Sequence, residues 1–263
     1  MKKYLKVASV VLVIAMIVCF AACGGKTEPE ETAAPEAEKK VLTMATNAEF
    51  PPYEYKEGDG YKGIDVEIAE AIAAKLGMEL KIEDIAFDSI IPGVQTGKYD
   101  MGMAGLTVNE ERLQTVNFSD SYATGIQSII VKEGSDIKSA DDLAGKKIGV
   151  QTSTTGDIYA TDDFGEENIT RYENGAVAVQ GLLEGKVDCV IIDNAPAKSY
   201  AEANKGLVVL DTEYVQEEYA ICFAKENTQL QADVNKALGE LIADGTVQTI
   251  IEKYIPVEET AAK

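Results

Sequence analysis

The sequence predicts an α/β protein with two similar lobes, and a repeated helix–turn–strand unit is the main basis for this prediction. In each copy an apolar helical pattern is followed by Gly-Lys-x-Asp and then by a short apolar run, first at Gly97–Asp100 and again at Gly185–Asp188. Glycine ends a helix readily because it enters the left-handed conformation freely. A short apolar run without alternation is typical of a strand buried on both faces. Two copies of one unit therefore indicate two lobes of the same design.

Strand and helix patterns alternate along most of the chain, which indicates mainly parallel sheets. We expect strands at residues 41–46, 79–85, 100–104, 126–132, 147–150, 169–172, 187–192, 207–210 and 219–224. We expect helices at residues 65–76, 88–96, 109–114, 139–143, 176–184, 193–204, 228–243 and 245–254, and one from the polar segment 151–157 to 164. Residues 47–60, which contain Pro51-Pro52, are expected to form a loop.

Local signals support the individual helices. In the helix at 65–76 the apolar residues recur at helical spacing, and Gly77 follows the last of them. Pro92 falls in the first turns of its helix, where proline is tolerated. Asn109 is a good N-cap residue for the short helix that it precedes.

The alternating pattern is interrupted twice, and both interruptions read as crossings between lobes. We expect hinge segments at residues 122–125 and 214–221. The first lobe is then formed by residues 41–121 and 222–256, and the second by residues 126–213. Two crossings make the first lobe discontinuous in sequence.

The N-terminal region is not expected to belong to the fold. Residues 1–22 combine lysines with an apolar run too short for a membrane span, as in a secretory signal peptide. The run ends Phe20-Ala-Ala-Cys23, which resembles the lipobox of bacterial lipoproteins and predicts lipidation of Cys23; the alternative is ordinary cleavage that leaves a free cysteine. Residues 23–40, rich in Glu, Ala, Pro and Thr, are expected to form a flexible tether.

Composition excludes several classes of function. The net charge is −21, and loss of Lys2, Lys3 and Lys6 with the signal peptide would make it −24. Such a charge repels nucleic acid and anionic membranes, so we expect membrane attachment only through the lipid. The absence of histidine excludes histidine triads and HExxH zinc sites, and we expect neither metal nor cofactor. Cys189 and Cys222 are expected to be buried small hydrophobic residues rather than a disulfide.

Candidate ligand groups follow the predicted strands, because open α/β sheets bind ligands at the carboxyl ends of their strands. These groups are Asn47, Glu49, Phe50, Phe87, Gly105, Leu106, Thr107, Arg112, Thr154, Thr155, Gly156 and Asp193. They match the two charged ends of a free amino acid. Arg112 and the helix N-terminus at Thr154–Gly156 suit a carboxylate. Asp193, the Gly105 carbonyl and the Thr107 hydroxyl suit an ammonium group, and the two phenylalanines suit an aliphatic stem.

The same segments resemble the polar amino-acid-binding proteins of ABC importers, solute-binding proteins of family 3. The resemblance rests on Ala45–Tyr53, Gly63–Asp65, Phe87–Pro92, Ala104–Thr107, Glu111-Arg112 and Phe118-Ser119, and it covers residues 41–256 in order. It implies a two-lobed, type II Venus-flytrap fold with two hinge strands. It also implies that Arg112 binds the carboxylate, that Asp193 binds the ammonium group, and that Asn47, Phe50, Phe87, Gly105, Leu106, Thr107, Gln151 and Thr155 line the cleft.

Two departures from the family pattern bear on the ligand. Asn47 stands where several members have aspartate, and Gln151 stands where the glutamine-binding member has lysine. Glutamine, cystine, arginine and lysine therefore all stay open as ligands. Glu49 and Asp65 are further candidates for reading the ligand side chain.

Several of these residues also have a purely structural interpretation. Arg112 could be a solvated helix residue, Thr107 a turn hydroxyl, and the two phenylalanines part of the core. Asp193 and Thr155 could cap helices, and for Asp65 an N-cap role is favoured over ligand contact. Glu49 reads best as an exposed loop acid.

Three functions remain open at this point. The favoured one is a lipid-anchored, extracytoplasmic, monomeric protein that binds a free L-amino acid and delivers it to the transmembrane subunits of an ABC permease. The second is a periplasmic dehydratase on the same fold, for which Glu49, Asp65 and Asp193 are the candidate general acids. The third is a sensor module that works with a separate membrane receptor.

Overall fold

The computed structural model describes residues 40–211 and 214–256, which belong to one compact unit of the chain. The predicted signal peptide, Cys23 and nearly all of the predicted tether lie outside the described residues. Within the described part, none of the helices has the length and apolar character needed to span a bilayer.

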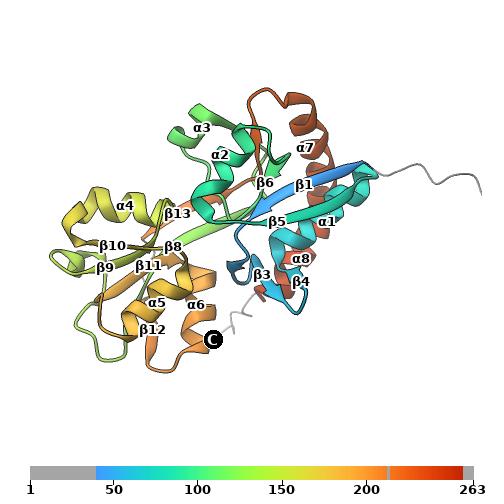
Figure 1. The fold of residues 1–263 in the computed structure, drawn as a ribbon. Helices are drawn as coiled ribbons and strands as arrows, with labels where there is room; N and C mark the ends of the chain where they lie inside the picture. The colour runs from blue at the N-terminus through green and yellow to red at the C-terminus, as the bar shows by residue number, and fades with distance from the viewer. Residues whose placement is uncertain (1–39, 212–213, 257–263) are drawn as a thin grey trace, which may run out of the picture. The chain divides into compact units, whose positions relative to one another are not determined.

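A five-stranded sheet forms the centre of what we call the first lobe (Figure 1). Its order is β5 (Glu79–Asp84), β1 (Val41–Thr46), β6 (Met101–Gly102), β14 (Cys222–Ala224) and β7 (Val116–Phe118). Strand β1 is parallel to β5 and β6, whereas β14 is antiparallel to β6 and β7. The helices of this lobe are α1 (Ile64–Leu76), α2 (Ile90–Gln95), α3 (Glu110–Thr115), α7 (Thr228–Ala243) and α8 (Thr246–Tyr254). Helix α1 packs against α7 and α8, which brings the C-terminal helices back to the N-terminal part of the chain.

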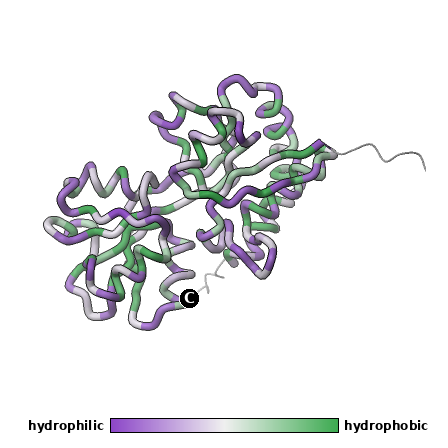
Figure 2. The backbone as a smooth tube through the Cα atoms, viewed as in Figure 1, coloured by the Kyte–Doolittle hydropathy of each residue, from purple (hydrophilic) through white to green (hydrophobic). Residues whose placement is uncertain are grey.

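A second sheet forms the centre of the second lobe. Its order is β10 (Ile169–Tyr172), β9 (Ile148–Gln151), β11 (Cys189–Asp193), β8 (Ala123–Lys132) and β12 (Leu207–Val209), with β13 (Val215–Tyr219) also paired to β8. The helices are α4 (Thr155–Phe164), α5 (Gly175–Leu183) and α6 (Asn194–Ala203), with 3₁₀ turns at Ala140–Leu143 and Glu166–Asn168. Figure 2 shows that the strands inside this lobe are mainly hydrophobic and that its outer loops are mainly hydrophilic.

The repeated unit has the same local structure in both lobes. Gly97 and Gly185 adopt φ angles of 71° and 75°, the left-handed region that glycine enters at little cost. The aspartate that follows binds the backbone of the neighbouring parallel strand, within β1 in the first lobe and just before β9 in the second. Asp100 Oδ2 accepts a hydrogen bond from the backbone N–H of Thr43 at 2.8 Å, and Asp188 Oδ2 accepts one from the N–H of Lys147 at 2.8 Å. The repeat is therefore a device that ends a helix and aligns two strands.

The expected hinge segments lie on one antiparallel pair of strands. Strand β8 begins at Ala123, which pairs with Tyr219 at the end of β13. The expected single strand at 219–224 is wrong, because Tyr219 ends β13 in the second sheet and Cys222 begins β14 in the first. The hinge role of these segments stays a prediction.

The expected loop at 47–60 is also partly wrong. Three short strands, β2 (Glu49–Phe50), β3 (Glu54–Glu57) and β4 (Gly60–Lys62), form a separate small sheet there. Strand β7 was not expected either, since α3 runs directly into it without a turn residue between them. Cys189 and Cys222 are buried, free thiols in different sheets.

Candidate functional site

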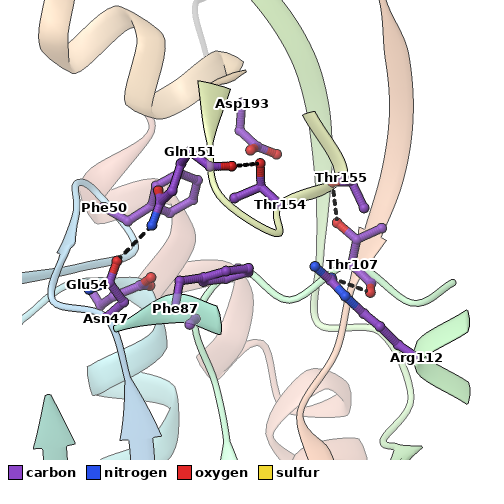
Figure 3. Close-up of a pocket in the computed structure, with 12 residues that line it drawn as sticks. Asn47, Phe50, Glu54, Phe87, Thr107, Arg112, Gln151, Thr154, Thr155 and Asp193 are labelled. Carbon is purple, nitrogen blue, oxygen red and sulfur yellow. Dashed lines mark hydrogen bonds between the residues drawn. The ribbon is translucent and has the colours of Figure 1, made fainter. Parts of the chain in front are cut away.

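A cavity lies at the carboxyl ends of the strands, where the two lobes meet (Figure 3). It is lined by Asn47, Phe50, Glu54, Phe87, Ala104, Gly105, Thr107, Arg112, Gln151, Thr154, Thr155 and Asp193. In the view of Figure 3, Arg112, Thr107 and Thr155 lie at one end, and Asn47 and Phe50 lie at the other.

Arg112 places a buried positive charge at one end of the cavity. Its helix is fixed by Asn109, whose Oδ1 accepts from the Arg112 N–H at 2.8 Å. The guanidinium donates Nη1–H to the carbonyl of Thr107 at 2.8 Å, and its centre lies 5.6 Å from the centre of the Phe87 ring. Only 7% of the residue is exposed, and burial lowers its pKa. Among the described residues it forms no ion pair with a carboxylate, so the charge lacks a compensating anion.

The N-terminus of α4 faces Arg112 from the second lobe. Thr154 is the N-cap, and its Oγ1 accepts from the N–H of Asp157 at 3.2 Å. Ser153 has a φ of 64°, an uncommon value for a residue other than glycine, and its N–H is held by Asp157 at 3.0 Å. This conformation lets the Ser153 carbonyl accept from Arg112 Nη2 at 3.2 Å. The alternative interpretation of Thr155 as a helix cap is wrong, because Thr154 caps the helix.

Thr107 and Thr155 extend this end of the cavity across the two lobes. Their hydroxyl oxygens lie 3.4 Å apart, and both residues are buried. The first turn of α4 leaves backbone N–H groups without helical partners, and the helix dipole makes this end positive. Together with Arg112 the arrangement suits a carboxylate.

Asp193 places a buried negative charge on the same cavity. It ends β11, is 8% exposed, and accepts a hydrogen bond from the hydroxyl of Tyr219. Burial and the nearby Glu217 raise its pKa to about 7, although Tyr219 and Gln127 partly oppose this shift. Asp193 occupies the N-cap position of α6, but its side chain makes no capping hydrogen bond, so the capping interpretation is wrong.

Two aromatic rings and a glycine turn form the walls between these charges. Phe50 stacks on Tyr53, with ring centres 5.9 Å apart, and Phe87 begins a 3₁₀ turn after β5. Gly105 has a φ of 53°, and a Cβ there would lie 3.0 Å from the Phe50 ring. A larger residue at position 105 would therefore be strained and would crowd the ring.

At the other end of the cavity two neutral side chains bind each other, and one of them also lines a neighbouring acidic pocket, which we call the acidic opening. Gln151 Nε2 donates to Asn47 Oδ1 at 3.0 Å, so the two departures from the family pattern bind each other. Asn47 also lines a second, more open pocket with Glu49, Asp84, Ile85, Ala86, Glu173 and Asn174. In that pocket Asp84 forms an ion pair with Lys56 at 2.5 Å.

Three predicted site residues lie outside this first cavity. Leu106 is fully buried in the core of the first lobe, and Glu49 is exposed at the acidic opening. Asp65 is fully buried behind Gly105, and its predicted N-cap role is wrong because Gly63 occupies that position.

Two residues that line the cavity, Glu54 and Ala104, were not among the candidates from sequence, although Ala104 lies inside one of the motifs and Glu54 directly follows another. Their positions in or next to these motifs could have identified them as cavity residues.

Comparisons with known proteins identify the family. Residues 42–257 match the profile of the bacterial extracellular solute-binding proteins, family 3. The chain belongs to this family.

Named relatives of the chain bind amino acids. It is 33% identical to the arginine-binding extracellular protein ArtP of Bacillus subtilis, over 98% of this chain and 100% of ArtP. It is 32% identical to a probable histidine-binding protein of Neisseria gonorrhoeae, over 98% of this chain and 97% of that protein.

Solved structures of the family show the same fold. An ancestral arginine-binding protein bound to glutamine superposes with a TM-score of 0.79 at 39% identity, covering 84% of this chain and 100% of that one. The arginine-, lysine-, histidine-binding protein ArtJ of Geobacillus stearothermophilus gives 0.80 at 37% identity, with 84% and 97% covered. These likenesses confirm the predicted two-lobed α/β fold of this family 3 protein.

Proposed function

We propose that this family 3 protein is the substrate-binding component of an ABC importer and holds a free L-amino acid between its lobes. One observation carries the proposal. Arg112 and Asp193 bring opposite, buried charges to a single cavity, and among the described residues neither has an ionic partner. A zwitterion supplies both missing charges at once.

In this proposal each end of the ligand has its own set of groups. The α-carboxylate binds the guanidinium of Arg112 and the N–H groups at the start of α4, near Thr155. The α-ammonium group binds Asp193, the hydroxyl of Thr107 and the carbonyl of Gly105. Hydrogen bonds to charged groups contribute about 1.5–3 kcal/mol each. A few of them, less the cost of ordering the ligand, account for an affinity of roughly −8 kcal/mol, which is micromolar.

The acidic opening favours a ligand with a cationic side chain. A side chain that passes between Phe50 and Phe87 reaches Asn47 and then the pocket that contains Glu49, Asp84 and Glu173. Three carboxylates line that pocket, and among the described residues only Asp84 has an ion-pair partner, Lys56, so the local charge attracts a cation. Relatives named as arginine-binding proteins agree with this choice. We take L-arginine as the first candidate ligand.

Titration calorimetry with a panel of free amino acids tests the proposal. L-Arginine, L-lysine, L-histidine, L-glutamine and L-cystine form the panel, and agmatine, which lacks the α-carboxylate, is the control. We expect at least one L-amino acid to bind with micromolar affinity and agmatine to bind far more weakly. Binding no tighter than about millimolar for every member would refute the proposal. Turnover of prephenate or arogenate would instead support the dehydratase alternative.

We further propose that Cys23 carries a lipid that holds the protein at the outer face of the membrane, near the permease. The supporting observation is the sequence Phe20-Ala-Ala-Cys23 after a short apolar run. Cys23→Ala should release the protein from the membrane fraction into the soluble extracytoplasmic fraction. Retention of the variant on the membrane would contradict the lipid anchor.

A further inference from the structure

Two buried carboxyl groups, those of Glu54 and Asp65, lie next to the cavity, and Glu54 is also one of the residues that line it. Glu54 begins β3 and is 1% exposed, and Asp65, in the first turn of α1, is fully buried. Asp65 Oδ2 accepts from the N–H of Gly105 at 2.9 Å and from the hydroxyl of Tyr122 at 2.9 Å. No described donor other than these carboxyl groups themselves reaches Asp65 Oδ1 or either carboxyl oxygen of Glu54.

The two carboxyls contact each other, and such a contact requires a proton. The Glu54 side chain hydrogen-bonds to Asp65, which is possible only when one of the two is protonated. Burial and the adjacent Asp65 raise the pKa of Glu54 well above its usual range. The pKa of Asp65 rises only to about 6, because the donors from Gly105 and Tyr122 stabilise its charge against burial. Glu54 therefore carries the proton at neutral pH and donates it to Asp65 Oδ1.

The described residues around the pair include no cation that would replace this proton. The titratable groups that face the pair are Tyr53, Tyr122, Tyr200 and Asp193, contributed by separate elements. The described residues around the pair also lack the grouping of three or more ligands that would hold a metal ion. A shared proton is thus the means by which the site tolerates two buried acids.

The pair holds a turn that belongs to the cavity. Gly105 lines the cavity and has a positive φ, so its position depends on what anchors it. Its N–H is bound by Asp65, and Asp65 is in turn bound by Glu54. Movement of either carboxyl would move the Gly105 carbonyl, which the proposed function assigns to the ligand ammonium group.

We propose that Glu54 and Asp65 are positioning residues: they share one proton and thereby fix the Gly105 turn for ammonium recognition, without bonding the ligand themselves. The ligand-binding part of this inference rests on the proposed function. The proton sharing and the anchoring of the turn do not, and they can be measured in the ligand-free protein.

NMR of the Gly105 amide tests the pair without ligand. In the wild-type protein we expect the amide proton to titrate with a midpoint near pH 6, as Asp65 takes up a proton. Glu54→Gln keeps a donor to Asp65 and should leave the midpoint near that value. Glu54→Leu removes the donor, so the midpoint should rise. Equal midpoints in the two variants would show that Glu54 only fills space and would overturn the proposal.

Calorimetry with L-arginine, and with L-glutamine as a second probe, tests the positioning role. We expect Glu54→Gln to stay within about threefold of wild-type affinity and Glu54→Leu to lose at least tenfold. Tyr122→Phe, which removes one donor from Asp65 outside the cavity, should lose a few-fold. Tyr172→Phe is the matched control, because its buried hydroxyl has no described partner and lies in the second lobe. The control should bind as the wild type does.

The outcomes separate the two proposals. If Glu54→Gln loses as much affinity as Glu54→Leu, the Glu54 carboxyl group contacts the ligand and the positioning role is wrong. If wild-type protein binds no member of the amino-acid panel, the proposed function fails. The Gly105 titration then still decides whether the carboxyl pair shares a proton and holds the turn.

Discussion

Single buried charges decide what the cleft can bind. Arg112 is held by two backbone carbonyls, and Asp193 is held by a tyrosine hydroxyl, so both are fixed in place without being neutralised. A buried charge without a counter-ion is costly. The ligand-free protein therefore pays a free-energy penalty for the two buried charges. A bound zwitterion removes this penalty because it supplies a counter-ion to each of them.

Replacing Arg112 separates binding from stability. Arg112→Ala removes the paired hydrogen bonds to the ligand carboxylate, which contribute about 3–6 kcal/mol together. The affinity for L-arginine in calorimetry should fall more than about 100-fold, since each 1.4 kcal/mol corresponds to tenfold. The melting temperature of the ligand-free protein should stay nearly unchanged, because the variant also removes an uncompensated buried charge. Lys186→Ala, at an exposed surface pair, is the control. Retained affinity in Arg112→Ala would refute the carboxylate assignment.

The raised pKa of Asp193 predicts a pH dependence of binding. The ammonium group of the ligand favours the ionised carboxylate, so binding releases a proton wherever Asp193 is protonated in the free protein. With a pKa of about 7 in the free protein, affinity should rise about tenfold per pH unit below pH 7 and level off above it. Calorimetry between pH 5.5 and 8, repeated in buffers of different ionisation enthalpy, measures both the slope and the proton release. A flat profile in the wild type would contradict the assignment of Asp193 to the ammonium group.

For single residues, the sequence identified the charged groups of the cavity, Arg112 and Asp193. It did not identify the buried carboxyl pair that holds the Gly105 turn. Arg112 and Asp193 stand directly after predicted strands or in a recognisable motif, so their place at the sheet edge could be inferred. Glu54 gave no comparable signal, because an acid between two tyrosines in an expected loop looks solvent-exposed. Only the packing of β3 on α1 shows that it is buried beside Asp65.

At the scale of elements, the repeated Gly-Lys-x-Asp unit has a physical role that is the same in both lobes. Its glycine ends a helix, and its aspartate binds the backbone near the start of the adjacent parallel strand. These contacts lie at the ends of the strands away from the cavity. The unit therefore supports the sheets, while the residues after the strands provide the ligand groups.

The two aspartates of the repeat should differ in their contribution to stability. Asp100 accepts from both the N–H and the hydroxyl of Thr43 and is partly buried, whereas Asp188 accepts from one exposed N–H of Lys147. We expect Asp100→Ala to lower the free energy of unfolding by about 1–3 kcal/mol and Asp188→Ala by about 0.5–1 kcal/mol in urea denaturation. Affinity for L-arginine should be unchanged in both variants. Equal losses of stability would show that the second bond to Thr43 contributes nothing.

Elements that depend on distant partners could not be predicted from local pattern. The run from Tyr219 to Ala224 contains no residue that breaks a strand, yet its two ends pair with different sheets. The short strands β2 and β4 carry weak local signals and exist because β3 lies between them. By contrast, β1 and α7 have long periodic patterns, and their predicted bounds agree with the structure.

At the scale of the whole molecule, polar contacts join the two lobes around the cavity. Arg112 of the first lobe donates to Ser153 of the second, and Gln151 of the second lobe donates to Asn47 of the first. At the rim, Glu49 accepts from Asn174 through its carboxylate. The two lobes therefore hold the cavity closed through contacts that a separated pair of lobes would lose.

The hydroxyl of Tyr200 offers a test of how these contacts contribute to binding. It donates to the backbone carbonyl of Glu49 at 2.6 Å, joining α6 of the second lobe to β2 of the first without lining the cavity. Removing one such bond in Tyr200→Phe costs the closed form about 0.5–1.5 kcal/mol, while each lobe keeps its own packing. The affinity for L-arginine should fall about 2- to 10-fold, mainly through faster dissociation in stopped-flow measurements, with the unfolding of ligand-free protein unchanged. Tyr172→Phe again serves as control. If Tyr200→Phe binds and releases ligand like the wild type, the contact between α6 and β2 does not stabilise the ligand-bound form, and closure depends on the cavity groups alone.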